Sequence, residues 1–235
     1  MNARILRLLA APALAVSGLA LVQPSAEAGM VTFTAATGGS ALAGASYSNF
    51  DGRTLGSTNQ TTASGLSVAF TGGGAFVQGS VTNQYAAPII SGANNLFFEQ
   101  NSTPGPDTTT YVSTGVGSTT LTFATGSSSY LGLLWGSVDA YNSLTFNFLD
   151  GTTQVVGGSA ILSAIGANAG GTTAYVNFTG SAFSSVVASS TANSFEFDNV
   201  ATTAAVPEPS SLALCGIAGA AGLGMARARR RRPTA

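Results

Sequence analysis

Short apolar or alternating segments recur along the chain at intervals of about 10 to 15 residues, separated by stretches rich in Gly, Ser, Asn and Thr. Segments of this kind, bounded by turn-forming residues, are typical of the strands of a β-sandwich or barrel. The predicted strands cover residues 31–33, 66–70, 75–81, 96–98, 110–112, 121–123, 130–135, 144–149, 153–156, 174–178, 183–187 and 195–200. We therefore predict an all-β fold, a single-domain antiparallel sandwich that is jelly-roll-like.

The clearest local signal is a hairpin in the second half of the chain. Leu144, Phe146 and Phe148 alternate with polar residues, so they share one face of a strand. Asp150-Gly151 follows this strand, and an Asp-Gly pair readily adopts the positive φ angles of a tight hairpin turn. This hairpin is the element that the sequence predicts most directly.

Two other segments depart from the strand pattern. Apolar residues fall at helical spacing within residues 159–169, with Ser159 as a candidate N-cap and Gly166 as a stop. The glycine pairs that flank this segment suit a loop around a short strand equally well. Residues 103–107 contain two prolines, which lack a donor for a β ladder, so a loop is predicted there.

Composition excludes several classes of function. Of the 235 residues 45% are hydrophobic and only 7% are charged, and the chain contains no His and no Lys. It therefore has no imidazole base, no His metal ligand, no Schiff-base amine and no P-loop lysine. Between residues 29 and 206, seven acidic residues accompany a single basic residue, Arg53, which gives a net charge of −6. A segment with this charge is not expected to bind nucleic acid.

The first 28 residues have the three parts of a secretory signal peptide. Two arginines precede an apolar stretch over residues 8–22, and Ala26-Glu27-Ala28 forms a small-x-small cleavage site. An uncleaved transmembrane anchor is the alternative, which the short and proline-containing stretch disfavours. We expect export through the Sec machinery and a mature chain that begins near Gly29.

A second three-part signal lies near the other end of the sequence. The motif Pro207-Glu208-Pro209 is followed by an apolar run over residues 212–226 and then by a cluster of arginines. The run of about 15 residues is roughly 22 Å long as a helix, shorter than the ~30 Å hydrocarbon core of a bilayer. The arginines favour the cytoplasmic side, which places the preceding domain outside. Representative residues of this membrane tail are Leu212, Leu214, Cys215, Ile217, Leu223, Arg227, Arg229 and Arg230.

This tail, residues 206–232, resembles the PEP-CTERM sorting signal of Gram-negative bacteria. The resemblance implies recognition by an exosortase, a membrane-embedded cysteine transpeptidase that cuts near the motif. Pro207, Glu208 and Pro209 would then be read as substrate. The alternative is an ordinary tail-anchored protein with an incidental Pro-Glu-Pro linker.

The body of the chain carries two further resemblances. Residues 131–146 and 195–200 look like the body of a group of exported PEP-CTERM proteins, which offer no established activity to transfer. The second of these segments is also similar, over six residues, to the last strand of jelly-roll carbohydrate-binding modules.

Acidic and amide side chains concentrate at two places next to strong β signals. They are Asp139, Asn142, Glu196, Asp198 and Asn199. Oxygen ligands of this kind suit Ca²⁺, which takes about 6 to 8 oxygens. Asp and Asn are also common at turns and strand ends, where their side chains bond to the local backbone. A structural calcium site and purely structural turn residues therefore both stay open.

Trp135, the only Trp of the chain, has two interpretations. With Tyr141 it would form an aromatic platform for a sugar ring, whereas in an apolar run the same indole is typical of a core. Enzymatic functions are disfavoured, because a serine hydrolase would lack its base. For a glycosidase, only carboxylate pairs such as Glu196 with Asp198 or with Glu99 remain.

Together these patterns predict an exported, non-enzymatic structural protein of the cell surface or of the exopolysaccharide of a biofilm matrix. It would reside in the inner membrane until an exosortase processes it. The alternative is a carbohydrate-binding module of the extracellular matrix. The predicted segments are a signal peptide (1–28), a β-sandwich domain (29–205) and a sorting signal (206–235), with calcium as the sole candidate cofactor.

Overall fold

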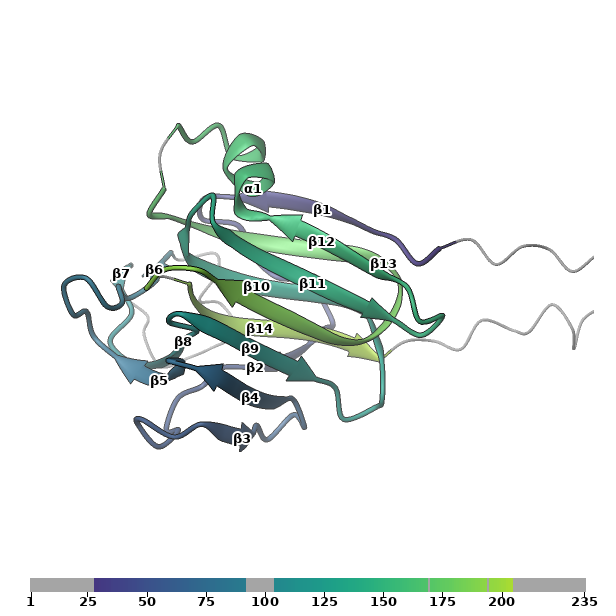
Figure 1. Cartoon of the computed structure of the whole chain (residues 1–235), viewed down its shortest axis with the longest axis horizontal. Helices are drawn as coiled ribbons and strands as arrows, with labels where there is room; N and C mark the ends of the chain where they lie inside the picture. Colours follow the sequence, from purple (N-terminus) through teal and green to yellow (C-terminus); the bar gives the residue numbers. More distant parts are fainter. Residues whose placement is uncertain (1–27, 92–103, 169, 194, 205–235) are drawn as a thin grey trace, which may run out of the picture.

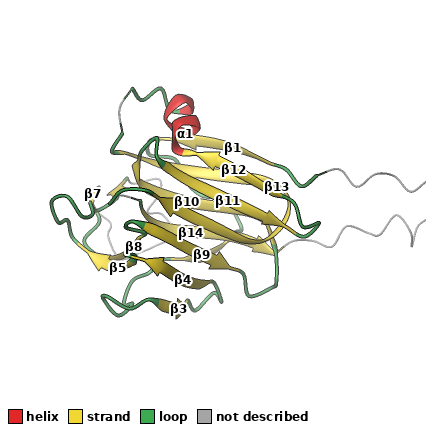
Figure 2. Ribbon diagram, viewed as in Figure 1, coloured by secondary structure: helices red, strands yellow, loops and turns green. Residues whose placement is uncertain are grey.

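The computed structural model describes residues 28–91, 104–168, 170–193 and 195–204. Its strands are β1 (Val31–Ala36), β2 (Ser46–Ser48), β3 (Asn59–Thr61), β4 (Ser67–Gly72), β5 (Ala75–Gln78), β6 (Ile89–Ile90), β7 (Gly105–Pro106), β8 (Thr110–Ser113), β9 (Gly117–Thr122), β10 (Ser128–Val138), β11 (Asn142–Phe148), β12 (Thr153–Gly157), β13 (Thr172–Ser190) and β14 (Glu196–Ala204). A short helix, α1 (Gly158–Ala164), follows β12 (Figures 1 and 2).

Three sequence predictions lie outside the described residues. They are the signal peptide up to residue 27, the strand at 96–98 and the sorting tail from residue 206 onwards. In the part of the chain that the structure does describe, no helix has the length and apolar character needed to cross a membrane.

The strands form an antiparallel, strongly curled sheet that resembles half of a barrel (Figure 2). Its main path runs β3-β4-β9-β13-β10-β14-β8-β5, and β1, β2, β11 and β12 join it as branches. The short strands β6 and β7 pair with each other in a separate two-stranded sheet. The predicted all-β antiparallel architecture is confirmed.

The structure shows one continuous curled sheet where the sequence pattern was interpreted as a jelly-roll-like sandwich, and β13 explains this continuity. This strand of 19 residues pairs with β1 and β10 along its first part and with β9 and β11 along its second part. β13 therefore runs without interruption from the part of the sheet that holds β1 and β10 into the part that holds β9 and β11. Sequence patterning divided β13 into two strands, because the apolar pattern stops at Thr179, Gly180 and Ser181. In the structure these three successive residues are exposed positions of one continuous strand.

The two halves of the curl enclose one large apolar cluster. It is filled from β10 by Leu131, Leu133 and Trp135, and half of its buried aromatic residues come from β11, β13 and β14. The Phe146 ring lies 4.9 Å from Phe178 and 5.1 Å from Phe183 between ring centroids, so it joins both parts of β13. Burial of such rings is the main stabilising contribution that a chain of this composition can make.

The predicted hairpin is confirmed as β11 and β12. Leu144, Phe146 and Phe148 are all buried, and Gly151 has a φ of 84° in the turn. The Asp150 Oδ1 atom accepts hydrogen bonds from the Thr152 amide at 2.8 Å and from its hydroxyl at 2.7 Å. The side chain therefore stabilises the turn that its residue type predicts.

The helix is present, with a different start from the one predicted. It begins at Gly158, its N-cap residue is Gly157, and no side chain caps it, so the proposed Ser159 cap is wrong. Gly166 ends the helical segment as predicted, with a φ of 67°. The predicted loop at residues 103–107 is wrong in part, because Gly105–Pro106 forms β7, where proline is tolerated in a short edge pairing.

Candidate functional site

Trp135 is fully buried, which confirms the core interpretation of this residue. Its indole stacks on Phe195 with ring centroids 4.3 Å apart and ring planes 11° apart. Its Nε1 atom donates a hydrogen bond to the Ser137 carbonyl at 3.2 Å. No face of the ring is left for a sugar, and Tyr141, which is 44% exposed, lies apart from any exposed indole.

Asn142 and Asp139 lie at the corner between β10 and β11, where they hold the chain in place. The Asn142 amide group donates to the Ser137 carbonyl at 2.9 Å and accepts from the Ser190 hydroxyl at 2.8 Å. The backbone carbonyl of Asp139 accepts a hydrogen bond from the backbone N–H of Asn142 at 3.1 Å. The Asp139 carboxylate accepts one from the Tyr141 hydroxyl at 3.1 Å. These contacts support the strand-end interpretation of both residues.

Along β14 the side chains alternate between two environments. Phe195, which precedes the strand, and Phe197 enter the apolar cluster, so Glu196 and Asp198 project from the opposite face. Both acids are buried nonetheless, with 0% and 1% of their surface exposed. Asn199 has a φ of 50°, and its carbonyl accepts a hydrogen bond from the Tyr175 hydroxyl at 2.9 Å.

Glu196 is a buried carboxyl with little polar compensation. Neither of its oxygens accepts a well-aligned hydrogen bond within the described part of the chain. Burial raises the pKa of Glu196 to about 7, partly opposed by the nearby Ser137 side chain and Ala86 amide and assisted by the charge of Asp139. This carboxyl therefore exchanges its proton near neutral pH.

Asp198 belongs to an acidic cluster that sequence patterning missed. Burial raises the pKa of Asp198 well above its usual range, and the carboxyl of Asp107, within hydrogen-bonding reach, raises it further. The charge of Asp51 acts in the same direction. Asp107 follows β7, and Asp51 follows β2, so three distant segments meet here. The sequence signal that could have indicated an acidic cluster was composition, because a single basic residue between residues 29 and 206 cannot neutralise seven acids.

The five candidate calcium ligands therefore do not form one site. Asp139 and Asn142 lie at a corner of the fold, whereas Glu196 and Asp198 have separate neighbours. Within the described residues, no group of three or more His, Cys, Asp and Glu side chains is arranged to hold a metal ion.

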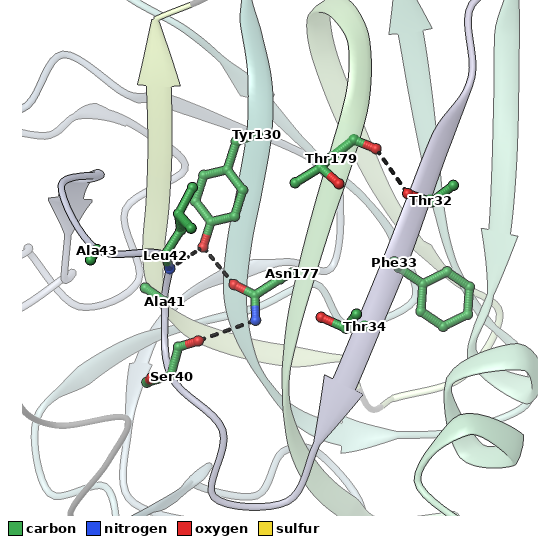
Figure 3. A pocket seen from close by; sticks show the side chains of 10 residues that line it. All are labelled: Thr32, Phe33, Thr34, Ser40, Ala41, Leu42, Ala43, Tyr130, Asn177 and Thr179. Carbon is green, nitrogen blue, oxygen red and sulfur yellow. Dashed lines mark hydrogen bonds between the residues drawn. The ribbon is translucent and has the colours of Figure 1, made fainter.

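An open groove of about 410 Å³ lies between β1 and the loop at residues 40–43 (Figure 3). All ten of its lining residues are uncharged. Its floor is built by a polar relay, in which the Tyr130 hydroxyl accepts from the Leu42 amide at 2.8 Å and donates to Asn177 Oδ1 at 2.6 Å. Asn177 in turn donates to the Ser40 carbonyl at 3.1 Å.

The rim of the groove is where a ligand would bind. Thr32 and Thr34 are exposed on β1, and the side chain of Leu42 is 51% exposed on the facing loop. Hydroxyls beside an apolar side chain suit a neutral, hydroxyl-rich ligand, because they offer hydrogen bonds without charge. Sequence analysis did not identify this groove, since its residues are ordinary strand and loop positions.

No protein-family model, no curated protein and no solved structure matches this chain. The function of the chain is therefore inferred from its geometry and its sequence motifs.

Proposed function

We propose that this chain is an exported protein that is processed by an exosortase at its C-terminal signal and serves as a structural component of the cell surface or the exopolysaccharide. The observation that carries the proposal is the succession, along the sequence, of Pro207-Glu208-Pro209, the apolar run and the arginine cluster. A short apolar run with arginines on one side is suited to temporary membrane insertion in a fixed orientation.

The positions of the two ends of the domain support this proposal. β1 begins at Val31 beside Gly180, and β14 ends at Ala204 beside Ser128, a residue that also pairs with Phe183. The start of β1 and the end of β14 therefore lie at the same end of the molecule (Figure 1). This arrangement would let an apolar segment before the domain and one after it enter the same membrane.

The end of β14 also supports cleavage at the motif. This strand lies inside the sheet, between β10 on one side and β2 and β8 on the other. It ends at Ala204, three positions before Pro207 in the sequence. Cleavage near the motif would therefore leave every strand of the domain intact.

The surroundings of Gly29 support removal of the signal peptide at the predicted position. The Gly29 nitrogen lies 2.8 Å from Asp150 Oδ2 and 3.0 Å from Thr152 Oγ1. After cleavage this nitrogen would be an ammonium group, and the carboxylate would become its ion-pair partner. A Cβ atom at this position would overlap the Phe148 ring, so the site suits glycine.

Replacing Pro207 and Pro209 together with Ala is expected to leave uncut precursor in the inner membrane, because the exosortase would no longer recognise its substrate. Mass spectrometry of the membrane and exterior fractions would detect the tail peptide and a mature N-terminus at Gly29. Pro233→Ala, which changes a proline outside the motif, is the matched control. Normal processing of the double variant would contradict the proposal, and a different N-terminus would contradict only the cleavage site.

The groove of Figure 3 favours a second candidate function, binding of a neutral glycan of the matrix. We expect Thr34→Arg to weaken co-sedimentation with the host exopolysaccharide at least about tenfold, since a long charged side chain would occupy the groove. Thr122→Arg, an exposed threonine on β9, is the control. Equal binding by both variants would exclude the groove. Trp135 emission is unsuitable as the readout, because the indole is buried.

A further inference from the structure

The contact between Asp107 and Asp198 is a buried pair of acidic side chains with little polar compensation. Each side chain is only 1% exposed, and the two carboxyl groups lie within hydrogen-bonding reach of each other. Two carboxylates this close in a medium of low dielectric constant repel strongly, so they require either a proton between them or a cation.

No positive side chain of the described residues supplies that compensation. Arg53 is the only basic residue among the described residues, and its Nη1 atom donates to the Thr61 carbonyl at 2.9 Å. A third carboxyl, Asp51, adds its negative charge to the pair. Asn49 donates to Asp51 Oδ2 at 2.8 Å, which is a neutral contact. Among the described residues, no positive side chain therefore offsets the charge that these three acids carry when they are ionised.

The hydrogen bonds of the pair leave one carboxylate oxygen open. Asp107 Oδ1 accepts from the Thr109 amide at 2.7 Å and from its hydroxyl at 2.6 Å. Asp107 Oδ2 is buried and accepts no hydrogen bond from any described residue. Asp198 Oδ1 accepts from the Phe50 amide at 3.3 Å. Asp107 Oδ2 is therefore a buried oxygen without a hydrogen-bond donor among the described residues, on the carboxyl that contacts Asp198. Such an oxygen is available to coordinate a cation.

We propose that Asp107 and Asp198 together bind one Ca²⁺ ion, with Asp51 as a neighbouring carboxylate that strengthens the local negative charge. Two carboxylates balance the charge of one divalent ion, and neutral oxygens or water complete its coordination. An all-oxygen set without His or Cys favours Ca²⁺ over Zn²⁺. Of the acids that the sequence pattern grouped together, this site uses only Asp198.

The ion would connect segments that are far apart in the sequence. Asp107 is held by its backbone, whose amide donates to the Pro88 carbonyl at 2.8 Å next to β6. Asp198 belongs to β14 in the interior of the sheet. Calcium would therefore fix the paired strands β6 and β7 onto the outer face of β14. This role does not depend on the proposed sorting function.

Terbium luminescence tests the site directly. The full chain, kept in mild detergent and freed of metal with EDTA, would be titrated with Tb³⁺ under excitation of its aromatic residues. Tyr111 is fully buried on β8, and the next residue of that strand, Val112, pairs with Phe197 beside Asp198, so Tyr111 lies close enough to sensitise the ion. We expect saturable emission that Ca²⁺ displaces, and that Mg²⁺, which demands strict octahedral geometry, displaces much less. Absence of saturable binding would overturn the proposal.

Two variants and a control assign the site to its residues. Asp107→Asn and Asp198→Asn are each expected to weaken Tb³⁺ and Ca²⁺ binding at least about tenfold. Asp139→Asn, which removes an acid at the β10–β11 corner, is expected to bind as the unchanged protein does. Equal loss in all three variants, or no loss in the first two, would overturn the assignment.

A measurement without variants covers the case in which they do not fold. Amide exchange of the unchanged protein is expected to slow in β8 and β14 when Ca²⁺ replaces EDTA. If Ca²⁺ leaves exchange unaltered and acidification alone slows it, the pair shares a proton and the calcium proposal is wrong.

Discussion

Trp135→Ala is expected to lower the free energy of unfolding by about 3 to 5 kcal/mol. The indole is fully buried, stacks on Phe195 and donates its one hydrogen bond to the Ser137 carbonyl. Its removal would leave a cavity in the apolar cluster, beside Phe195. For a domain of this size the loss corresponds to a fall in Tm of about 10 °C.

Urea unfolding followed by circular dichroism would measure the effect, because the variant has no tryptophan to report by fluorescence. Trp135→Phe is the matched control. It keeps an aromatic ring against Phe195 and loses only part of the volume and the hydrogen bond, so a smaller loss is expected. A loss below about 1 kcal/mol for Trp135→Ala would show that the surroundings collapse onto the site, or that the indole is not buried.

The elements that the sequence predicted well are those whose cause is local. Alternation fixes which face of β11 is buried, and Asp150-Gly151 supplies its own turn geometry, so neither depends on distant partners. The stop at Gly166 has the same character, since a positive φ is a property of one residue.

The failures concern properties that arise only from pairing. β2 is three residues long and exists because Ser46 and Ser48 lie opposite Thr202 and Val200 of β14. The short strand β7 depends in the same way on β6. The continuity of β13 was also invisible, because a strand that passes between two halves of a curled sheet exposes consecutive residues and so resembles a turn.

The candidate site shows the same division. Sequence patterning identified Glu196 and Asp198 as unusual acids on a strong strand, and both are buried. It grouped them with Asp139 by residue type, although their surroundings differ. The partners of Asp198 are Asp107 and Asp51, which come from other segments and carry no local pattern that links them to β14.

Glu196→Gln is expected to remove the contribution of this one carboxyl to a loss of stability that the unchanged protein suffers between about pH 5 and pH 8. The pKa of Glu196 is raised to about 7 in the folded protein from 4.5, chiefly by burial. Between these values the folded state binds a proton that the unfolded state has released. Stability is therefore present at low pH and is lost as the pH rises, by about 3 kcal/mol in total.

Urea unfolding at several pH values, at one fixed calcium concentration, would separate this carboxyl from the others. At pH 8 the Gln variant is expected to be more stable than the unchanged protein, and near pH 5 the two should agree. Asp150→Asn is the control, because this acid lies on the surface and its pKa is lowered by hydrogen bonds from Thr152. That variant should keep the fall between pH 5 and pH 8. If Glu196→Gln keeps the same fall, the burial of a neutral Glu196 is wrong, and its carboxylate has a compensating partner in solution.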